Sequence, residues 1–584
     1  MTGGKSIRDH ALGGDEVRPP SVLGDRCPIT ALGHADQTYY FGDADGQLIA
    51  LTPRSLTLNA VLGLFAGDQT WLKESYPSPK RGRKTDAPFD LNGLVPDLIR
   101  ACHQAGFFDP SMVRGIGLWP VGRDLEPGGS AVLHCGDKLG VLTWRKDRMM
   151  VAWQRAGKRI GDYIYPSSRA IPVPGETALT TEQTAELQAF VGRWVWADKV
   201  LHPHLFLGWV AVATLLGLVD RRPIAWVLGE KGCGKSTLMG FAKALVNDWP
   251  WRYEDTTAAH IRDKAVRTRA SVPVIVDEAE QRGDSTKILN LVELSRFTYT
   301  RGQGHYGRGG AGGAEGHVDA IFMFGAINPP PVSTQDESRH ALLELRPLSL
   351  TAGEIRVFEA DLARMSALGP NLVKRLHGRW PGFRTNLSAY RDALHGIGLD
   401  PRGVDTYGTL FAAADLVLYD EPTTAEGAAS WAAHLLPRTA EAEGGSTAER
   451  VWEWLMTKPV DGWQAGRRPI VGELVAEAIH FGSGSDAAER LKDLGLSLLE
   501  HEKQWWVAVA GRHNGLRPLF AGSDWAAGGW AKLLLGLPGS VPTPNPVRFA
   551  GARTRGTLVP VVYVPEHEIT QARGGPPPDK ALDQ

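Results

Sequence analysis

The segment 229–236 combines the residue types and the spacing of a phosphate-binding loop. It reads G-E-K-G-C-G-K-S and matches G-x-x-x-x-G-K-[ST] at every fixed position. Glycines allow successive backbone N–H groups to point at one anion, and the N-terminus of a following helix adds positive potential there. The residues expected to surround such an anion are Gly229, Glu230, Lys231, Gly232, Cys233, Gly234, Lys235, Ser236 and Thr237.

The last residues of this loop have the chemistry of a nucleoside triphosphate site. Lys235 is placed to reach the β- and γ-phosphates, and Ser236 is placed to bind Mg²⁺. The apolar run "PIAWVL" before the loop predicts a buried strand, and "TLMGFAKALVN" after it predicts an amphipathic helix. We therefore predict that the loop binds ATP with Mg²⁺. The alternative is a glycine turn that only lets a strand and a helix pack closely.

A pair of carboxylates follows a second apolar run. In "VPVIVDEAE" a mostly β-branched stretch ends in Asp277 and Glu278. Such a stretch predicts a buried strand, and ligands of open α/β sheets bind at the carboxyl ends of the strands. We expect Asp277 to hold Mg²⁺ through water and Glu278 to polarise the attacking water. The alternative is that both carboxylates only cap the end of a strand.

Two further residues are candidates for catalysis. "AIFMFGAINPP" predicts another buried strand that ends before Asn328, whose amide is placed to orient the attacking water. A turn-forming Asn before Pro is the alternative. Farther on, "QDESRHALLEL" contains Arg339, which we interpret as an arginine finger acting on the ATP of a neighbouring subunit. A salt-bridged surface arginine is the alternative for Arg339, and Arg346 is a second candidate for the finger.

The elements around these motifs predict an α/β fold built on a parallel sheet. Helix, strand, glycine turn, helix and two more buried strands alternate between about 194 and 350. The apolar run "LFLGWVAVATLLGLV" predicts a buried helix, because it is shorter than the roughly 20 residues of a membrane span. Before the sheet, "TYYFGDADGQLIAL" and "AVLHCGDKLGVLTW" each predict a β-hairpin.

The chain is predicted to contain several domains, because 584 residues exceed one hydrophobic core. Helix-like segments starting near 448, 471 and 486 precede a hairpin in "LSLLEHEKQWWVAVA", which favours a winged-helix-like domain. The expected divisions are a flexible terminus 1–25, a mixed α/β domain 26–192, the P-loop core 193–350, a helical lid or connector 351–438, the winged-helix-like domain 446–568 and a disordered tail 569–584.

Composition narrows the functional classes. The chain is 43% hydrophobic and 22% charged with a net charge of −1, so no global basic field attracts nucleic acid and any contact with DNA must be local. Four cysteines without C-x-x-C spacing indicate unpaired thiols in a reducing compartment. No apolar signal segment is visible at the N-terminus, and we expect a cytoplasmic protein that does not enter membranes.

The series GEKGCGKS, VIVDEAE, FGAINPP and DESRHALLEL resembles the ATPase core of AAA+ ring proteins. More narrowly it resembles the superfamily 3-type helicase module of phage and mobile-element replication proteins, including primase-helicases. The resemblance covers residues 200–350, about a quarter of the chain. It implies a homo-oligomeric ring, expected to be a hexamer, with ATP between subunits, single-stranded or forked DNA in the centre and possible replication proteins as partners.

The resemblance also implies a DNA-gripping hairpin just before the strand that ends at Asn328. That interval reads "YTRGQGHYGRGGAGGAEGHV" and offers Arg301, His305 and Arg308 as contacts to the DNA backbone. It is richer in glycine than a stiff hairpin and contains no lysine. An ordinary flexible loop is therefore the alternative.

We thus hypothesise an ATP-hydrolysing, ring-type DNA helicase or translocase that serves replication of a phage or mobile genetic element. The alternative is an AAA+ ATPase that remodels proteins or acts as a regulatory or defence switch without helicase activity. A primase fused to the helicase is a weaker third option, because "GDADGQ" is explained more simply as the turn of a hairpin.

Overall fold

A computed structural model describes most of the chain and divides it into two compact units, Met1–His434 and Leu435–Gln584. Each unit has its own hydrophobic core. The described residues are 22–78, 88–122, 129–145, 148–279, 286–307, 315–327, 338–347, 350–435, 447–461, 468–501, 504–521, 523, 525 and 529–561.

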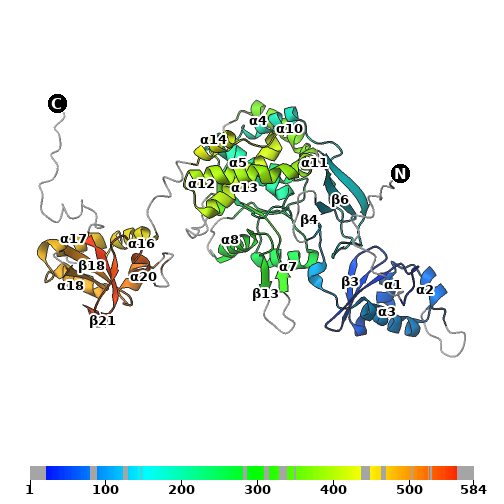
Figure 1. Ribbon diagram of the computed structural model, residues 1–584, viewed down its shortest axis with the longest axis horizontal. Coiled ribbons are helices and arrows are strands. Elements are labelled where there is room, and N and C mark those ends of the chain that lie inside the picture. The colour runs from blue at the N-terminus through cyan, green and yellow to red at the C-terminus, as the bar shows by residue number, and fades with distance from the viewer. Residues whose placement is uncertain are drawn as a thin grey trace, which may run out of the picture. The chain divides into compact units, whose positions relative to one another are not determined.

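The first unit is built on a sheet of five parallel strands, which confirms the predicted parallel sheet and adds two strands, β11 and β16, that the sequence analysis did not name (Figure 1). The strands lie in the order β11 (Trp251–Tyr253), β12 (Val274–Val276), β15 (Phe322–Ala326), β10 (Ile224–Leu228) and β16 (His340–Glu344). β15 therefore separates β10, which precedes the glycine-rich loop, from β12, which precedes Asp277. This mixed α/β architecture is consistent with the core of a P-loop ATPase of the AAA+ type.

Helices cover this sheet. The buried helix expected in the long apolar run is α5 (Leu201–Thr214), all of whose residues are buried, so that prediction is confirmed. Trp209 on α5 donates a hydrogen bond from its indole Nε1 to the carbonyl oxygen of Phe322 on β15, at 3.1 Å. The other helices next to the sheet are α6 (Lys235–Leu245), α7 (Ala258–Thr268) and α8 (Thr286–Thr298).

The helices that follow the sheet, together with one helix that precedes it in the chain, form a helical group, and the predicted helical character of the residues after the sheet is confirmed. In Figure 1 this group gathers at the top of the unit. The group packs tightly against α5, because a Cβ added at Gly208 would lie 2.3 Å from the carbonyl oxygen of Leu410. The helices are α4 (Thr181–Val191), α10 (Ala352–Ser366), α11 (Gly369–Arg379), α12 (Phe383–Gly396), α13 (Pro401–Leu418) and α14 (Ala425–Ala433).

The beginning of the described chain forms a small antiparallel sheet with three helices. Asp43 closes the predicted hairpin turn, since its Oδ1 accepts hydrogen bonds from the backbone N–H groups of Asp45 and Gln47, at 3.0 and 2.7 Å. The hairpin in "TYYFGDADGQLIAL" is thereby confirmed. The elements are β1 (Thr30–Ala35), β2 (Thr38–Gly42), β3 (Leu48–Leu51), α1 (Leu58–Leu64), α2 (Thr70–Ser75) and α3 (Leu91–Ala105).

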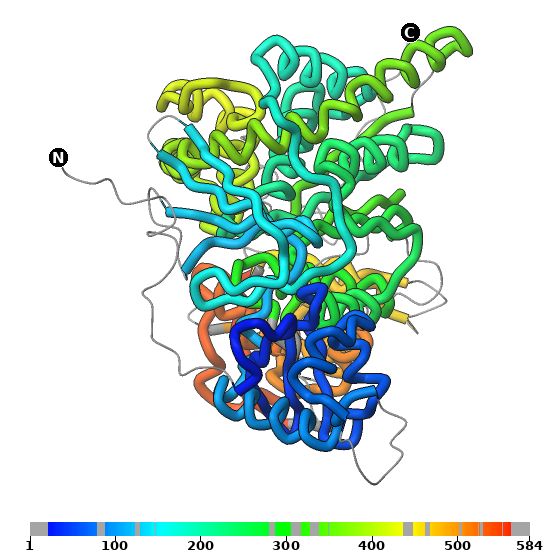
Figure 2. The backbone as a smooth tube through the Cα atoms, turned by 90° about the vertical axis from the view of Figure 1, so that its right-hand side faces the viewer, coloured from blue at the N-terminus to red at the C-terminus, as the bar shows by residue number. Residues whose placement is uncertain are grey.

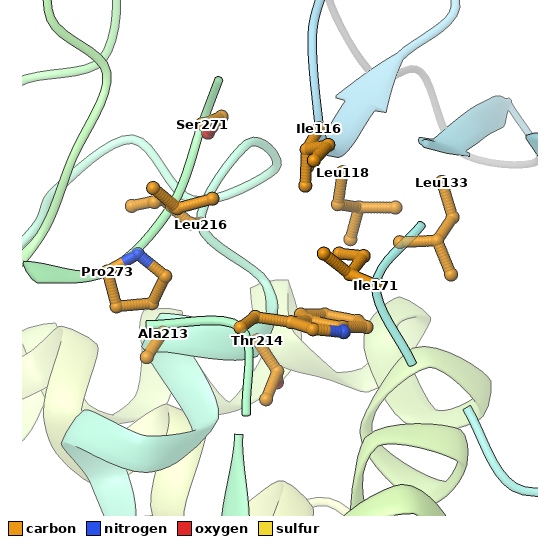
Figure 3. Close-up of a pocket in the computed structure, with 12 residues that line it drawn as sticks. Ile116, Leu118, Leu133, Ile171, Ala213, Thr214, Leu216, Ser271 and Pro273 are labelled. Atoms are coloured by element: carbon orange, nitrogen blue, oxygen red, sulfur yellow. The ribbon is translucent and has the colours of Figure 1, made fainter. Parts of the chain in front are cut away.

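A four-stranded antiparallel sheet, which contains the second predicted hairpin, packs directly on the P-loop core (Figure 2). A Cβ at Gly217, just after α5, would lie 1.6 Å from the carbonyl oxygen of Leu118. The contact leaves a space of only about 10 Å³, whose lining is mostly apolar and includes the hydroxyl residues Thr214 and Ser271 (Figure 3). The strands are β4 (Gly117–Pro120), β5 (Ser130–His134), β6 (Lys138–Arg145) and β7 (Arg148–Arg155), and the small ladder β8 (Lys158–Ile160) and β9 (Tyr163–Tyr165) follows them.

The second unit starts with the three predicted helices and the predicted hairpin. Two later strands extend that hairpin into a sheet of order β17-β18-β22-β19. The winged-helix assignment therefore stays a prediction. The elements are α16 (Thr447–Met456), α17 (Val471–Phe481), α18 (Asp486–Asp493), β17 (Leu496–His501), β18 (Gln504–Ala510), α19 (Leu516–Leu519), α20 (Trp530–Leu534), β19 (Val541–Pro542), β20 (Val547–Phe549), β21 (Ala552–Thr554) and β22 (Gly556–Pro560).

The predicted domain boundaries stay predictions. Two of the divisions, 1–25 and 569–584, lie largely or wholly outside the described residues.

Candidate nucleotide site and its surroundings

The glycine-rich loop connects β10 to α6 at the carboxyl end of the sheet. Three of its glycines have positive φ: 153° at Gly229, 87° at Gly232 and 86° at Gly234. A Cβ at Gly229 would also lie 2.5 Å from the carbonyl oxygen of Leu345, so a side chain is excluded there on two grounds. The backbone thus turns sharply and leads directly into the N-terminus of α6, where an anion is favoured.

Lys235 folds back over this loop. Its ammonium Nζ donates hydrogen bonds to the carbonyl oxygens of Gly229 and Glu230, the second at 3.2 Å. Ser236 and Thr237, the next two residues of α6, are exposed. The lysine charge and both hydroxyl side chains therefore lie at the loop, where the sequence pattern places a polyphosphate.

Asp277 follows β12 directly and faces the start of α6. Its backbone N–H donates to the carbonyl oxygen of Tyr253 at 2.9 Å, which extends the parallel ladder by one residue. The carboxylate is buried, and its Oδ1 accepts a hydrogen bond from the hydroxyl of Ser236 at 3.0 Å. Two residues 41 positions apart in the sequence, both predicted to be magnesium ligands, are thereby brought into contact.

Arg252 on β11 is a member of this site that the sequence motifs did not reveal. Its guanidinium NH2 lies 2.6 Å from Oδ2 of Asp277 and donates to the backbone carbonyl of Ser236 at 3.0 Å. The side chain lies across α6 at Gly240, where an added Cβ would be 2.9 Å from the guanidinium NH1. The one sequence signal for this contact is a glycine inside an amphipathic helix.

Glu278 lies beside this pair at the edge of the sheet. It is exposed, whereas Asp277 before it is buried. Its backbone N–H donates to the carbonyl oxygen of Glu254 at 3.3 Å. The backbone N–H of the next residue, Ala279, donates to the carbonyl oxygen of Gly325. The backbone on both sides of Glu278 is therefore held, while the side chain faces solvent next to the loop.

These residues fit Mg²⁺ and ATP. The loop leaves space at Gly232, where an added Cβ would meet nothing within 4 Å. A lysine, a hydroxyl and a buried carboxylate surround the start of α6. Hydroxyl and carboxylate oxygens are the ligands that Mg²⁺ prefers in nucleotide sites. Among the described residues there is no cluster of three or more His, Cys, Asp or Glu that could hold a metal alone.

The two candidates for the arginine finger lie at opposite ends of the same strand, β16. Arg339 precedes β16 at the amino edge, where its backbone carbonyl accepts a hydrogen bond from Ile224. The length of β10 separates this edge from the loop, about 16 Å at roughly 3.3 Å per residue. Arg346 follows β16 at the carboxyl edge, beside the loop. Arg339 is thus remote from the loop of its own subunit, as a finger acting on a neighbour must be.

The predicted DNA-gripping segment contains a hairpin of β13 (His305–Gly307) and β14 (Glu315–His317). Figure 1 shows β13 at the lower side of the unit, away from the helical group. His305 lies on β13, whereas Arg308 lies outside the described residues. Asn328 also lies outside them, directly after the end of the described strand region. The roles of these three residues stay predictions.

Both legs of this hairpin are fixed to the residues that lead into β10. Before β13, Arg301 forms an ion pair with Asp220 at 3.0 Å. After β14, buried Asp319 forms an ion pair with buried Arg222, and the Arg222 charge lowers the pKa of Asp319 against the raising effect of burial. Arg301 therefore lies at the base of the hairpin rather than at its tip.

The same junction includes Arg339. Its guanidinium carbon lies 5.8 Å from the centre of the Tyr299 ring, within range of a cation–π contact. The Tyr299 hydroxyl lies 2.8 Å from the Thr406 hydroxyl. The Thr406 hydroxyl in turn donates a hydrogen bond to the carbonyl oxygen of Ser338, directly before Arg339, at 2.7 Å. The predicted finger and the base of the hairpin thus share contacts in one small region, and the sequence alone did not indicate this.

Two expectations about cysteines and membranes can be compared with the structure. The four cysteines are free, as predicted, and burial raises the pKa of Cys27 and Cys102 to about 11. In the part of the chain that the structure describes, no helix is long and apolar enough to span a membrane.

Comparison with known proteins gives only distant similarities. No protein-family model and no curated protein matches the chain. The apo structure of the NrS-1 C-terminal region is 13% identical and covers 76% of this chain and 96% of its own, with a TM-score of 0.30. A full-length MCM homologue from Methanopyrus kandleri is also 13% identical and covers 56% of this chain and 76% of its own, with a TM-score of 0.28. Values this low assign no family to the chain.

Proposed function

We propose that this protein hydrolyses ATP at the loop between β10 and α6. The observation that carries the proposal is the contact between Ser236 and Asp277, at 3.0 Å. It joins the hydroxyl of the phosphate-binding loop to the carboxylate of a different strand, at the edge of the sheet where ligands bind. A glycine turn used only for packing does not require that pairing.

Each side chain at the loop has its own role in the proposed hydrolysis. Lys235 leaves its loop carbonyls to neutralise the β- and γ-phosphates, and the loop N–H groups hold the phosphate oxygens. Ser236 and Asp277 hold Mg²⁺, which when bound neutralises charge that develops on the phosphates. Glu278, exposed at the same edge, orients water and accepts its proton.

Arg339 acts on the ATP of a neighbouring subunit. Its place at the amino edge, remote from its own loop, supports this role in trans. We propose, as the sequence resemblance implies, that the chain assembles into a homo-oligomeric ring, a hexamer, in which each site is completed by the next subunit. Charge on the guanidinium stabilises the transition state.

A complementation experiment tests the assignment of Arg339. Lys235→Ala and Arg339→Ala variants should each lose turnover, whereas a mixture of the two should recover part of it. In the mixture some interfaces pair an intact loop with an intact Arg339. A mixture no more active than its components contradicts the role in trans, provided that both variants co-purify in one assembly.

We further propose that hydrolysis drives movement along single-stranded or forked DNA during replication of a phage or mobile element. The hairpin β13–β14 supports this, because its two legs are tied to the residues that lead into the ATP-binding strand. A change at the loop can thus reach the hairpin through β10. Strand separation of a labelled fork tests the proposal, with Glu278→Gln as the inactive control. Hydrolysis without any strand separation or DNA stimulation contradicts it.

A further inference from the structure

The second unit contains a large groove that the nucleotide site does not explain. It encloses about 1440 Å³ between the hairpin β20–β21, the end of α18 and strand β17. Its lining includes the cations Lys492, Arg548 and Arg553 and the half-buried ring of Trp505. All of these residues belong to the second unit, so the groove is complete within it.

The hairpin that forms one wall is firmly attached to its unit. Phe549 is 1% exposed and belongs to the hydrophobic core. At the turn, the N–H of Ala550 donates to the carbonyl oxygen of Lys492 at 3.2 Å, and the carbonyl oxygen of Ala550 bonds to the His513 ring at 3.1 Å. Because side chains alternate along a strand, burial of Phe549 leaves Arg548 exposed.

Two arginines lie directly opposite each other on this hairpin. Arg548 on β20 and Arg553 on β21 are partners in the antiparallel register, and both are exposed. Like charges at such positions destabilise a β ladder. In the described part of the second unit neither forms an ion pair with a carboxylate, and Arg553 Nε donates a hydrogen bond to the carbonyl oxygen of Pro546, at 3.2 Å. An external anion would remove this repulsion.

The remaining charges of the groove leave this end positive. Of its two carboxylates, Glu489 is bound by the ammonium of Lys492 at 2.6 Å. Glu500 lies on β17, opposite Trp505 in the register of the β17–β18 hairpin. The groove therefore combines a pair of guanidinium groups with an aromatic ring. Proteins that bind single-stranded nucleic acid use basic side chains to contact the phosphates and aromatic rings to stack on the bases.

We propose that this groove binds single-stranded DNA. Arg548 and Arg553 hold one or two phosphates, and Trp505 stacks against a base. The choice of DNA rests on the proposed function, whereas the recognition of a single-stranded phosphodiester backbone rests on the groove itself. Because all residues of the site lie outside the first unit, we expect it to bind without nucleotide.

The test measures binding of a fluorescein-labelled oligo(dT) by anisotropy, with the full chain, without nucleotide and over a series of salt concentrations. Arg548→Gln/Arg553→Gln should weaken binding by about tenfold near 0.1 M salt and reduce the slope of log K against log salt by about 0.7 to 1.4, at about 0.7 for each lost phosphate contact. Arg548→Lys/Arg553→Lys should keep most of the affinity and the slope.

Arg512→Gln/Arg517→Gln is the matched control, since it removes the same charge from exposed positions of the same unit outside the groove. It should bind like the wild type. Equal losses in the two glutamine variants would overturn the proposal, as would no loss in either. Because like charges repel in the native hairpin, the Arg548→Gln/Arg553→Gln variant should melt no lower than the wild type.

Binding of oligo(dT) by the groove and hydrolysis of ATP at the loop are measured separately, so either proposal can fail without the other. Loss of binding without nucleotide reports on the groove alone. A protein that binds oligo(dT) through the arginine pair but releases no phosphate from ATP supports the groove and contradicts the helicase. A protein that hydrolyses ATP with DNA stimulation, while both glutamine variants bind alike, supports the helicase and contradicts the groove.

Discussion

Arg252 offers the sharpest test of how the metal-binding carboxylate is held. It contacts Oδ2 of Asp277 at 2.6 Å, while Oδ1 faces the hydroxyl of Ser236. We infer that the guanidinium orients the carboxylate so that the oxygen needed for Mg²⁺ points toward the serine. The Arg252→Met substitution removes the charge and the hydrogen bonds but keeps a long side chain beside Gly240.

The expected effect of Arg252→Met on Mg²⁺ binding follows from how far the Arg252–Asp277 ion pair is exposed to solvent. The Asp277 side chain is 7% exposed, but that of Arg252 is 31% exposed, so solvent screens the pair. A fully buried pair costs about 3–5 kcal/mol when one partner is removed, and an exposed pair about 1 kcal/mol or less. A value of about 1 kcal/mol is the better figure here, and it corresponds to about a fivefold change in an equilibrium constant.

The assay is the Mg²⁺ concentration that gives half-maximal binding of a fluorescent ATP analogue. Arg252→Met should raise this concentration by about fivefold, and Arg252→Lys should raise it less. Arg267→Met is the control, because Arg267 forms a comparable pair with Asp263 in which both side chains are more than half exposed. It should have no effect. If Arg252 only competes with the metal, the half-saturating concentration will fall instead, and the reasoning is wrong.

Three further outcomes follow from the structure. Glu278→Gln should reduce turnover by about 10²- to 10⁴-fold while the ATP analogue still binds, measured by phosphate release and fluorescence, and unchanged turnover would exclude it as the base. Asp319→Asn should destabilise the first unit by about 3–5 kcal/mol in urea, because it leaves buried Arg222 unpaired, whereas Asp220→Asn in an exposed pair should cost under about 1 kcal/mol. Burial raises the pKa of Asp415 from 3.8 to about 7, so its contribution to stability is complete below pH 3.8 and is lost as the pH rises to 7. In urea unfolding, the free energy of unfolding of Asp415→Asn should therefore rise relative to that of the wild type between pH 3.8 and pH 7. A difference between the two proteins that does not change with pH would contradict this.

The sequence predicts the parts of the site that depend on local pattern. The glycine spacing, the strand before it and the carboxylate after β12 are each recognisable within about ten residues, because backbone geometry at a phosphate site tolerates few residue types. The three central strands β12, β15 and β10 of the sheet follow in the same way from buried apolar runs that alternate with helices.

What the sequence could not predict depends on contacts between distant residues. Arg252 lies in a strand of three residues, too short for a periodic signal, and its partner Asp277 is 25 positions away. Arg301 was predicted to contact DNA because of its charge and its place in a glycine-rich loop. In the structure it pairs with Asp220, 81 positions earlier, and only folding shows that pairing.

ATP hydrolysis by this chain is tested by the rate of phosphate release from ATP by highly purified protein, with and without single-stranded DNA. We expect steady phosphate release in Mg²⁺ that rises when DNA is added, and loss of both the basal and the stimulated rate in Lys235→Ala. A wild-type protein that releases no more phosphate than Lys235→Ala under either condition contradicts the central claim.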